Sequence, residues 1–151
     1  MKSCKETIGF LLHDAARLLK RDFERRARSL GLTRAQWQVL AHLARNEGIN
    51  QVGLADLLDV EPITLCRQID RMEEGGWVAR RPDPGDRRAR LLFITDKARP
   101  VIVQMRALAE EVYAEALDGL PDAARAQLIA ALQHVRGNLA DQPIETRAVA
   151  S

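Results

Sequence analysis

Cysteine, histidine and aromatic residues are scarce in this sequence of 151 residues. Its two cysteines, Cys4 and Cys66, are too few and too far apart for a disulfide framework, so we expect both to be reduced thiols. No apolar run approaches the roughly 20 residues that a bilayer span requires. The early run Ile8–Leu12 is interrupted by His13 and Asp14, and no small-residue cleavage site follows. The sequence therefore predicts a cytoplasmic protein without a signal peptide.

Groups of residues that build enzyme active sites or metal centres are also missing. The three histidines, His13, His42 and His134, fall on separate predicted helices and have no motif partner. There is no metal-ligand spacing, no nucleophile elbow and no phosphate-binding loop. We therefore expect no catalytic site, no metal and no cofactor, and the sequence does not predict an enzyme.

What is present is a leucine- and alanine-rich chain with 46% hydrophobic and 29% charged residues, typical of a mainly helical protein. Apolar residues recur at three- and four-residue steps over residues 5–30, which predicts one long amphipathic helix ending at Gly31. Thr33 and Gln36 have the spacing of a capping box, so a second helix should begin there and run to about Arg45.

Two short helices are expected next, joined by a tight turn. Asn50 is a good cap for a helix over residues 51–58. After a turn at residues 59–61, Pro62 suits the first turn of a following helix, which should stop at the glycine pair 75–76. Two short helices connected in this way have helix-turn-helix geometry.

A β-hairpin should follow these helices. Residues 77–81 and 88–94 are predicted strands, because the proline- and glycine-containing segment 82–86 is expected to continue neither of them. Although the net charge of the chain is only +2, the hairpin is strongly basic. Such a local patch is typical of a surface that meets phosphates. Its arginines are Arg80, Arg81, Arg87, Arg88 and Arg90.

Two further helices complete the predicted fold. Thr95 should cap a long helix that is broken at Gly119, and Pro121 should open the last helix. The long apolar stripes of the terminal helices need a cover, and a second copy of the chain is the expected one, with an intramolecular bundle as the alternative. The predicted fold is mainly α with a small β-hairpin, a winged helix-turn-helix with N- and C-terminal dimerisation helices. Its parts are a helical dimerisation region at 5–30 and 96–140, a DNA-binding domain at 33–95 and a frayed tail at 141–151.

The helix that begins at Pro62 has two distinct faces. Leu65, Ile69 and Met72 form an apolar stripe, whereas polar residues lie on nearly the opposite side. Arginine and glutamine can pair with base edges in the major groove, and a threonine methyl can contact a thymine methyl. The polar face is formed by Thr64, Arg67, Gln68 and Arg71.

These segments together resemble the MarR family of bacterial transcriptional regulators, in particular its SlyA-like branch. The resemblance covers residues from about Gly9 to Leu139. It rests on Leu32-Thr33, Trp37, Leu54-Ala55, the run Arg67-Gln68-Ile69-Asp70-Arg71-Met72-Glu73, Gly76-Trp77-Val78, Asp86-Arg87-Arg88 and Ile94-Thr95.

The resemblance implies a homodimer that binds a pseudo-palindromic duplex and controls transcription. It places the helix after Pro62 in the major groove and inserts Arg87 into the minor groove, while Asp86 and Arg88 pair to shape the hairpin tip. Pro62 itself stands one place earlier than the proline often found in the family. The candidate DNA-binding residues are Pro62, Thr64, Arg67, Gln68, Arg71, Asp86, Arg87, Arg88 and Arg90.

A small aromatic carboxylate or phenolic acid is the expected effector, and its binding would release a repressor from DNA. Arg17 and Lys20 lie three residues apart on the first helix and can converge on one anion, while Trp37 offers an aromatic wall. Relatives that bind salicylate have similar residues at matching positions, although Ala35 replaces a hydroxyl here. The candidate ligand site comprises His13, Arg17, Lys20 and Trp37.

Two other functions stay open at this point. A thiol-redox regulator could use Cys66, although the family's peroxide sensors place their cysteine where this sequence has Gly9. A helical adaptor for other proteins is the second alternative, but such a protein has no need of an arginine-rich hairpin.

Overall fold

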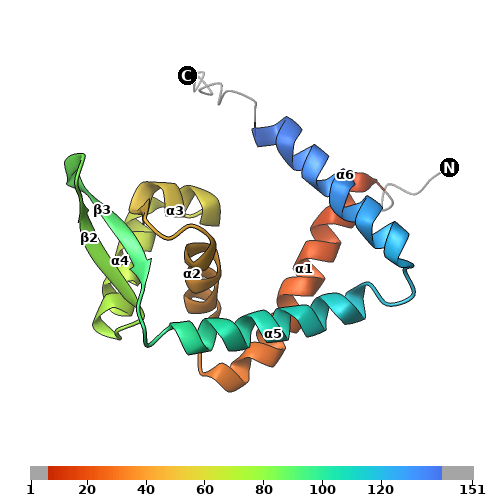
Figure 1. The fold of residues 1–151 in the computed structure, drawn as a ribbon, viewed down its shortest axis with the longest axis horizontal. Helices are drawn as coiled ribbons and strands as arrows, with labels where there is room; N and C mark the ends of the chain where they lie inside the picture. The colour runs from red at the N-terminus through yellow and green to blue at the C-terminus, as the bar shows by residue number, and fades with distance from the viewer. Residues whose placement is uncertain (1–6, 141–151) are drawn as a thin grey trace, which may run out of the picture. The chain divides into compact units, whose positions relative to one another are not determined.

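The computed structural model describes residues 7–140 and divides them into two compact units, of which the first ends at Tyr113 and the second begins at Ala114. Most of these residues are helical, and three strands form one antiparallel sheet, as expected for a winged helix-turn-helix (Figure 1). The elements are α1 (Ile8–Ala27), the 3-10 turn η2 (Arg28–Leu30), α2 (Arg34–Arg45), β1 (Ile49–Asn50), α3 (Gln51–Leu58), α4 (Pro62–Glu74), β2 (Val78–Asp83), β3 (Asp86–Ile94), α5 (Arg99–Ala116) and α6 (Asp122–Ala140).

The predicted helix ends are set by local capping contacts. The Thr33 hydroxyl accepts from the backbone N–H of Gln36 at 3.2 Å, and the Gln36 side chain accepts from the N–H of Thr33 at 3.0 Å. The Asn50 side chain accepts from the N–H of Gly53 at 2.8 Å and opens α3. Gly31, with φ of 69°, closes the first helical segment after a final 3-10 turn. These predictions are confirmed, except that the first helix begins at Ile8, after an extended Thr7, and not at Lys5, which itself lies outside the described residues.

The turn between α3 and α4 is short because Asp59 adopts a left-handed conformation with φ of 53°. Its backbone N–H donates to the carbonyl of Asp56, and the N–H of Val60 donates to that of Ala55. Pro62 is then the first residue of α4, as the sequence predicts, where no N–H donor is needed. This turn fixes the direction in which α4 leaves α3.

The sheet differs from the predicted hairpin in two respects. It has a third strand, β1, which pairs with β3 through Ile49 and Leu92 and was not expected. Moreover, β2 and β3 extend further toward the tip, since Pro82 pairs with Arg90, so residues 82–86 do not form one loop as predicted. Pro82 is tolerated because β2 is an edge strand in the order β1-β3-β2, where a missing N–H can face outward.

The start of α5 also lies later than expected. Thr95 does accept from the N–H of Ala98 at 3.4 Å, but residues 96–98 form a turn and the helix begins only at Arg99. The Thr95 hydroxyl in addition donates to the carbonyl of Gly76. It therefore ties the end of the hairpin to the turn that follows α4.

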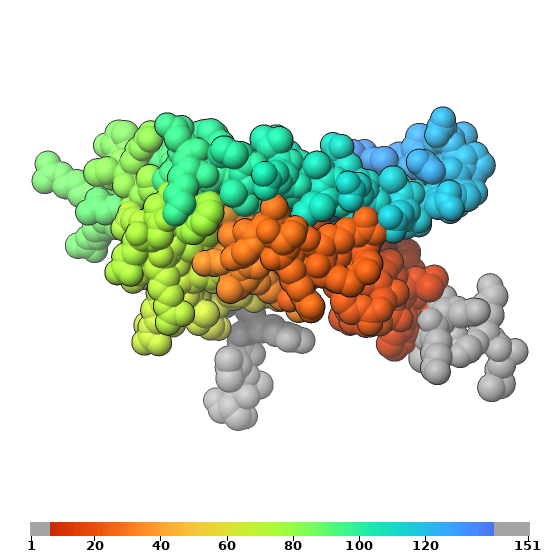
Figure 2. All heavy atoms as spheres, turned by 90° about the horizontal axis from the view of Figure 1, so that it is seen from below, coloured from red at the N-terminus to blue at the C-terminus, as the bar shows by residue number. Residues whose placement is uncertain are grey.

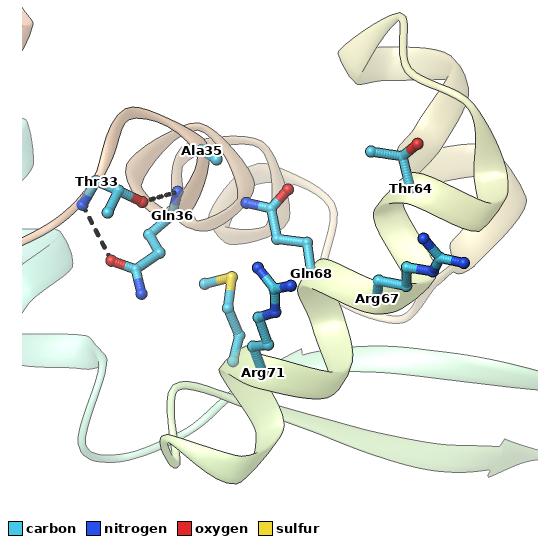
Figure 3. Close-up of a pocket in the computed structure, with 8 residues that line it drawn as sticks. Thr33, Ala35, Gln36, Thr64, Arg67, Gln68 and Arg71 are labelled. Atoms are coloured by element: carbon cyan, nitrogen blue, oxygen red, sulfur yellow. Dashed lines mark hydrogen bonds between the residues drawn. The ribbon is translucent and has the colours of Figure 1, made fainter.

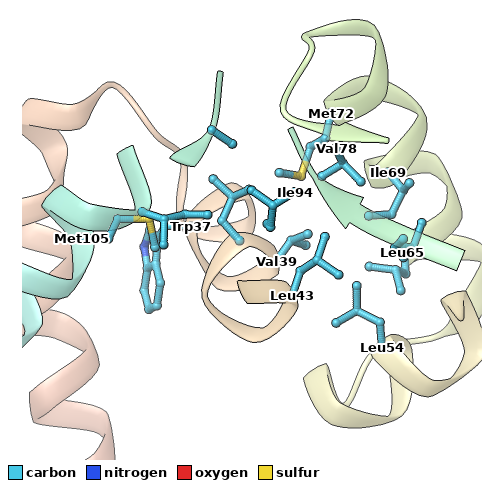
Figure 4. Packing of buried hydrophobic residues seen from close by; sticks show 14 of the residues in the cluster. Trp37, Val39, Leu43, Leu54, Leu65, Ile69, Met72, Val78, Ile94 and Met105 are labelled. Atoms are coloured by element: carbon cyan, nitrogen blue, oxygen red, sulfur yellow. The ribbon is translucent and has the colours of Figure 1, made fainter. Parts of the chain in front are cut away.

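A single hydrophobic core holds α2, α3, α4 and the sheet together within the first unit (Figure 4). The predicted inward stripe of α4 is confirmed, because Leu65 and Ile69 are 0% exposed and Met72 is 1% exposed. They pack in one cluster with residues of the other elements. The largest fully buried side chains among these partners are Val39, Leu40, Leu43, Leu54, Val78 and Leu92.

The terminal helices, in contrast, keep much apolar surface exposed. The stripe predicted along α1 is covered at its C-terminal end, where Phe23 is buried, but Ile8 is 69% exposed and Leu11 is 57% exposed. In the second unit α6 has no buried residue, and Leu132 and Leu139 of its predicted stripe are exposed. No helix between residues 7 and 140 is long and apolar enough to cross a membrane.

Candidate nucleic-acid interface

The outer face of α4 presents polar side chains because its inner face is fixed in the core. Thr64, Arg67 and Arg71 are exposed, and Pro62 is exposed at the start of the helix. Gln68 is only half-buried and points toward α2 together with Arg71, whereas Arg67 points away (Figure 3). The helix therefore offers two guanidinium groups and a hydroxyl on the surface that the sequence predicts for base contacts.

A cleft of about 360 Å³ lies between this face of α4 and the N-terminal turn of α2 (Figure 3). Its walls come from Thr33, Ala35 and Gln36 on one side and from Thr64, Arg67, Gln68, Arg71 and Met72 on the other. The Nε2 atom of Gln68 is buried and has no hydrogen-bond partner among the described residues. A buried donor without a partner is costly, so an acceptor brought by a bound molecule would stabilise this amide. The neighbours from α2 were not expected, because no local pattern links residues 33–36 to α4.

The tip of the hairpin is shaped by two aspartates and carries exposed arginines. The Asp83 side chain accepts from the N–H of Gly85 at 2.9 Å, and the Asp86 side chain accepts from the N–H of Arg88 at 2.9 Å. The expected pairing of Asp86 with Arg88 is thus made through the backbone of Arg88. The tip projects from one end of the first unit, where Figure 2 shows it in green. Its exposed arginines are Arg87, Arg88 and Arg90.

Fewer of the five hairpin arginines are free than the sequence suggests, because Arg80 is largely buried and Arg81, although exposed, stacks on an aromatic ring. The Arg80 side chain is 16% exposed and lies 2.6 Å from a carboxylate oxygen of Asp70 and 3.3 Å from one of Glu73. Burial alone would lower the pKa of Arg80, but hydrogen bonding and charge from Asp70 and Glu73 outweigh burial and raise it. Arg81 lies over the ring of Phe93, 4.5 Å from its centroid. Arg80 is therefore held by intramolecular contacts, and it was not among the candidate DNA-binding residues.

A second, larger cavity of about 860 Å³ lies within the first unit, between α1, α2, α3 and α5. Lys20 and Trp37, two of the four expected ligand residues, line it together with Phe23 and His42. Phe23 and Trp37 meet edge to face with ring centroids 4.6 Å apart. The Nε1 atom of Trp37 is buried and has no hydrogen-bond partner among the described residues. The cavity thus combines aromatic walls with a cation and an unpaired donor.

The other two expected ligand residues lie outside this cavity. His13 and Arg17 are exposed on α1, and the Arg17 guanidinium is 3.5 Å from a carboxylate oxygen of Asp14. Sequence reasoning did not find His42, since only the packing of α1 on α2 brings it beside Lys20. Burial lowers the pKa of His42, and the charges of Arg45 and Lys20 lower it further.

The thiol alternative gains no support from the geometry. Cys66 is partly buried, and its backbone carbonyl accepts from Arg80 at 3.3 Å. Cys4 lies outside the described residues. No group of three residues that could hold a metal ion occurs between residues 7 and 140.

We expect Arg67→Ala to relax preference at one base pair and to cost about 1–3 kcal/mol on the best site, because the variant cannot pair two-pronged with guanine. Arg87→Ala should weaken binding most where the flanking sequence is A·T-rich, since a narrow minor groove attracts an inserted arginine. Affinities for duplexes chosen by in vitro selection would measure both effects, with the exposed Arg28→Ala as control. Parent-like binding of every duplex by both variants would refute this assignment.

The stability of the fold should depend on pH through His42. Because burial lowers its pKa in the folded state, the unfolded chain binds more protons below an ordinary pKa of about 6.5. The contribution of His42 is therefore fully present above that pH and is lost as the pH falls through the lowered value. Urea unfolding of the parent and His42→Gln over pH 5 to 8 should reveal a shallower acid loss in the variant, whereas His13→Gln should behave like the parent.

Comparisons with known proteins show that this chain is similar to regulators of transcription. A model of the MarR family matches residues 30–89. The transcriptional regulator PA3341 has 34% sequence identity and a TM-score of 0.79, over 90% of this chain and 100% of the other. Wild-type MarR from E. coli in its apo form has 28% identity and a TM-score of 0.73, over 85% and 96% of the two chains. A MarR family regulator from Listeria monocytogenes, complexed with 26mer DNA, has 28% identity and a TM-score of 0.78, over 90% and 91%.

Proposed function

Because this chain belongs to the MarR family of transcriptional regulators, we propose that it binds a pseudo-palindromic duplex as a homodimer. Its relatives are regulators and not enzymes, in agreement with the sequence. The observation that carries the proposal is the exposed face of α4, whose opposite face is held in the core, next to a hairpin with exposed arginines. The Listeria relative, which was crystallised with 26mer DNA, supports the binding of DNA by this chain.

Each candidate residue has a distinct role in this proposal. Arg67 and Arg71 read base edges in the major groove, and Gln68 joins them when its amide, which is closed to solvent in the free protein, turns toward a base. Arg87 enters the minor groove, and Asp86 holds the tip that presents it. Pro62 and Thr64 contact bases or phosphates near the start of α4. Arg88 and Arg90, on the hairpin, contact the phosphate backbone.

The dimer follows from the apolar surface that the terminal helices leave exposed. Ile8 and Leu11 on α1, and Leu128, Leu132 and Leu139 on α6, are each at least 40% exposed in the single chain. An exposed apolar stripe along each of these helices favours an interface, and a closed two-fold dimer is the commonest arrangement of identical subunits. We therefore assign residues 5–30 and 96–140 to dimerisation and residues 33–95 to DNA binding. The two DNA-binding domains of the dimer would then contact half-sites about one helical turn of DNA apart.

Sedimentation at micromolar concentration should give the mass of a dimer. Leu128→Asp with Leu132→Asp should shift the protein to a monomer and weaken its binding to the pseudo-palindrome, because two charges would be buried in the interface. Val52→Asp, at an exposed site of α3 outside the assigned dimerisation region, is the control for an added charge. A parent protein that sediments as a folded monomer would be incompatible with the proposal.

We further propose that the protein is a repressor released by a small aromatic acid that binds in the 860 Å³ cavity. The ring would pack against Phe23 and Trp37, the carboxylate would pair with Lys20, and a ligand oxygen would accept from the buried Nε1 of Trp37. The exposed pair of Arg17 with Asp14 is worth only about 0–1 kcal/mol, so Arg17 is available to an incoming anion. The ligand would lower DNA affinity by favouring a dimer in which the two DNA-binding domains are too far apart or too close together to enter successive major grooves.

Calorimetry with benzoates, hydroxycinnamates and salicylates should detect binding to the parent and a lower DNA affinity in their presence. Lys20→Ala should abolish the heat while the variant still folds and binds DNA, because it removes a cation that lines the cavity. Adding Arg17→Ala to this variant tests whether the exposed Arg17 also contributes to holding the anion. Arg21→Ala, an exposed arginine of the same helix outside the cavity, is the control. Absence of heat with every compound, together with unchanged DNA affinity, would exclude this class of effector.

A further inference from the structure

Arg80 is the centre of a group of contacts that joins three elements of the first unit. Besides the carboxylates of Asp70 and Glu73, its guanidinium reaches the Gln51 side chain, with Nε donating at 2.8 Å. Its Nη2 donates to the carbonyl of Cys66 at 3.3 Å. We call Arg80, Asp70, Glu73 and Gln51 the Arg80 cluster. It connects β2 of the hairpin to α4 and to the first residue of α3.

The contacts engage all three nitrogens of the guanidinium. The backbone N–H of Arg80 also donates to a Glu73 carboxylate oxygen at 3.2 Å, so Glu73 holds both the side chain and the strand itself. Planar, multiply bonded arginine contacts have a fixed geometry, unlike a single ion pair on a mobile lysine. The Arg80 side chain is only 16% exposed, but the Asp70 and Glu73 side chains are 55% and 43% exposed, so water and salt screen the contacts from the carboxylate side.

Because the hairpin tip lies far from the Arg80 cluster, a small rotation at the cluster would displace the tip appreciably. Pro84 lies four residues beyond Arg80 along β2 and the turn, which is about 13 Å at 3.3 Å per residue. A rotation of about 10° at Arg80 would therefore move the tip by about 2 Å, enough to break a hydrogen bond in the minor groove. On α4, Asp70 lies about one turn from Arg67, so the same cluster is anchored beside the major-groove contacts.

We propose that the Arg80 cluster is a positioning device that sets the hairpin at a fixed angle to α4, so that helix and hairpin engage their grooves in register. The inference rests on the proposed binding of DNA by these two elements. It assigns Arg80 to specificity and not to phosphate binding. Asp70 and Glu73, which as negative charges near DNA should weaken binding, instead strengthen binding to the specific site.

The decisive experiment removes the two carboxylates and not the arginine. Asp70→Asn with Glu73→Gln keeps side-chain shape on an exposed part of α4, and unfolding curves would check that the variant folds. Simple electrostatics predicts tighter binding to all DNA after the removal of two negative charges. The positioning role predicts at least tenfold weaker binding to the site selected by the parent, with equal or tighter binding to a random duplex. Tighter binding to both duplexes would overturn the proposal.

A matched variant removes two negative charges without touching the Arg80 cluster. Glu61 and Glu74 are exposed at the two ends of α4, so Glu61→Gln with Glu74→Gln should tighten binding to both duplexes. If this control also bound the selected site more weakly, while its binding to the random duplex was not weakened, charge and not position would be responsible. The proposal would then fail.

The salt dependence of binding separates positioning from phosphate binding. If Arg87 neutralises one phosphate, Arg87→Ala should reduce the slope of log K against log salt by about 0.9. Arg80→Met keeps the aliphatic stem and should weaken specific binding while leaving that slope unchanged. A slope reduced as in Arg87→Ala would make Arg80 a phosphate ligand and overturn the inference. If the parent bound no duplex at all, the proposed function itself would fail, which is a distinguishable result.

Discussion

The burial of one face of α4 is the constraint on which the rest of the DNA-binding unit depends. Leu65, Ile69 and Met72 each contribute about 1.5–3 kcal/mol by leaving water, and together they fix the rotation of the helix about its axis. That rotation decides that Thr64, Arg67 and Arg71 face outward. A core of apolar side chains thus determines where the polar side chains of α4 are presented, although the core itself would not contact DNA.

The hairpin depends on the same core through a second set of contacts, which are polar. Val78 and Leu92 anchor the sheet in the hydrophobic cluster, and the Arg80 cluster attaches β2 to α4. Thr95 and Lys97 add contacts from the segment before α5 to the carbonyls of Gly76 and Gly75. The turn after α4 is therefore held both by the sheet and by the segment that leads into α5.

Two buried hydrogen-bond donors have no acceptor among the described residues. Gln68 presents one toward the cleft at α4, and Trp37 presents another among the residues that line the larger cavity. Native proteins pair nearly all buried polar groups, and exceptions call for an explanation. Because both nitrogens are closed to solvent, an acceptor from DNA or from an acidic ligand would reach them only after the side chain turns.

The sequence by itself determined most helix boundaries, the inner stripe of α4 and the family, because caps, turns and helical periodicity are local signals. Thr33, Asn50 and Pro62 act within a few residues of their own position, so their effects could be predicted. Strand β1, the engagement of Arg80 and the place of His42 beside Lys20 were decided only by tertiary structure. Each depends on segments distant in sequence, and a side chain's role there is set by what packs against it rather than by its neighbours in the chain.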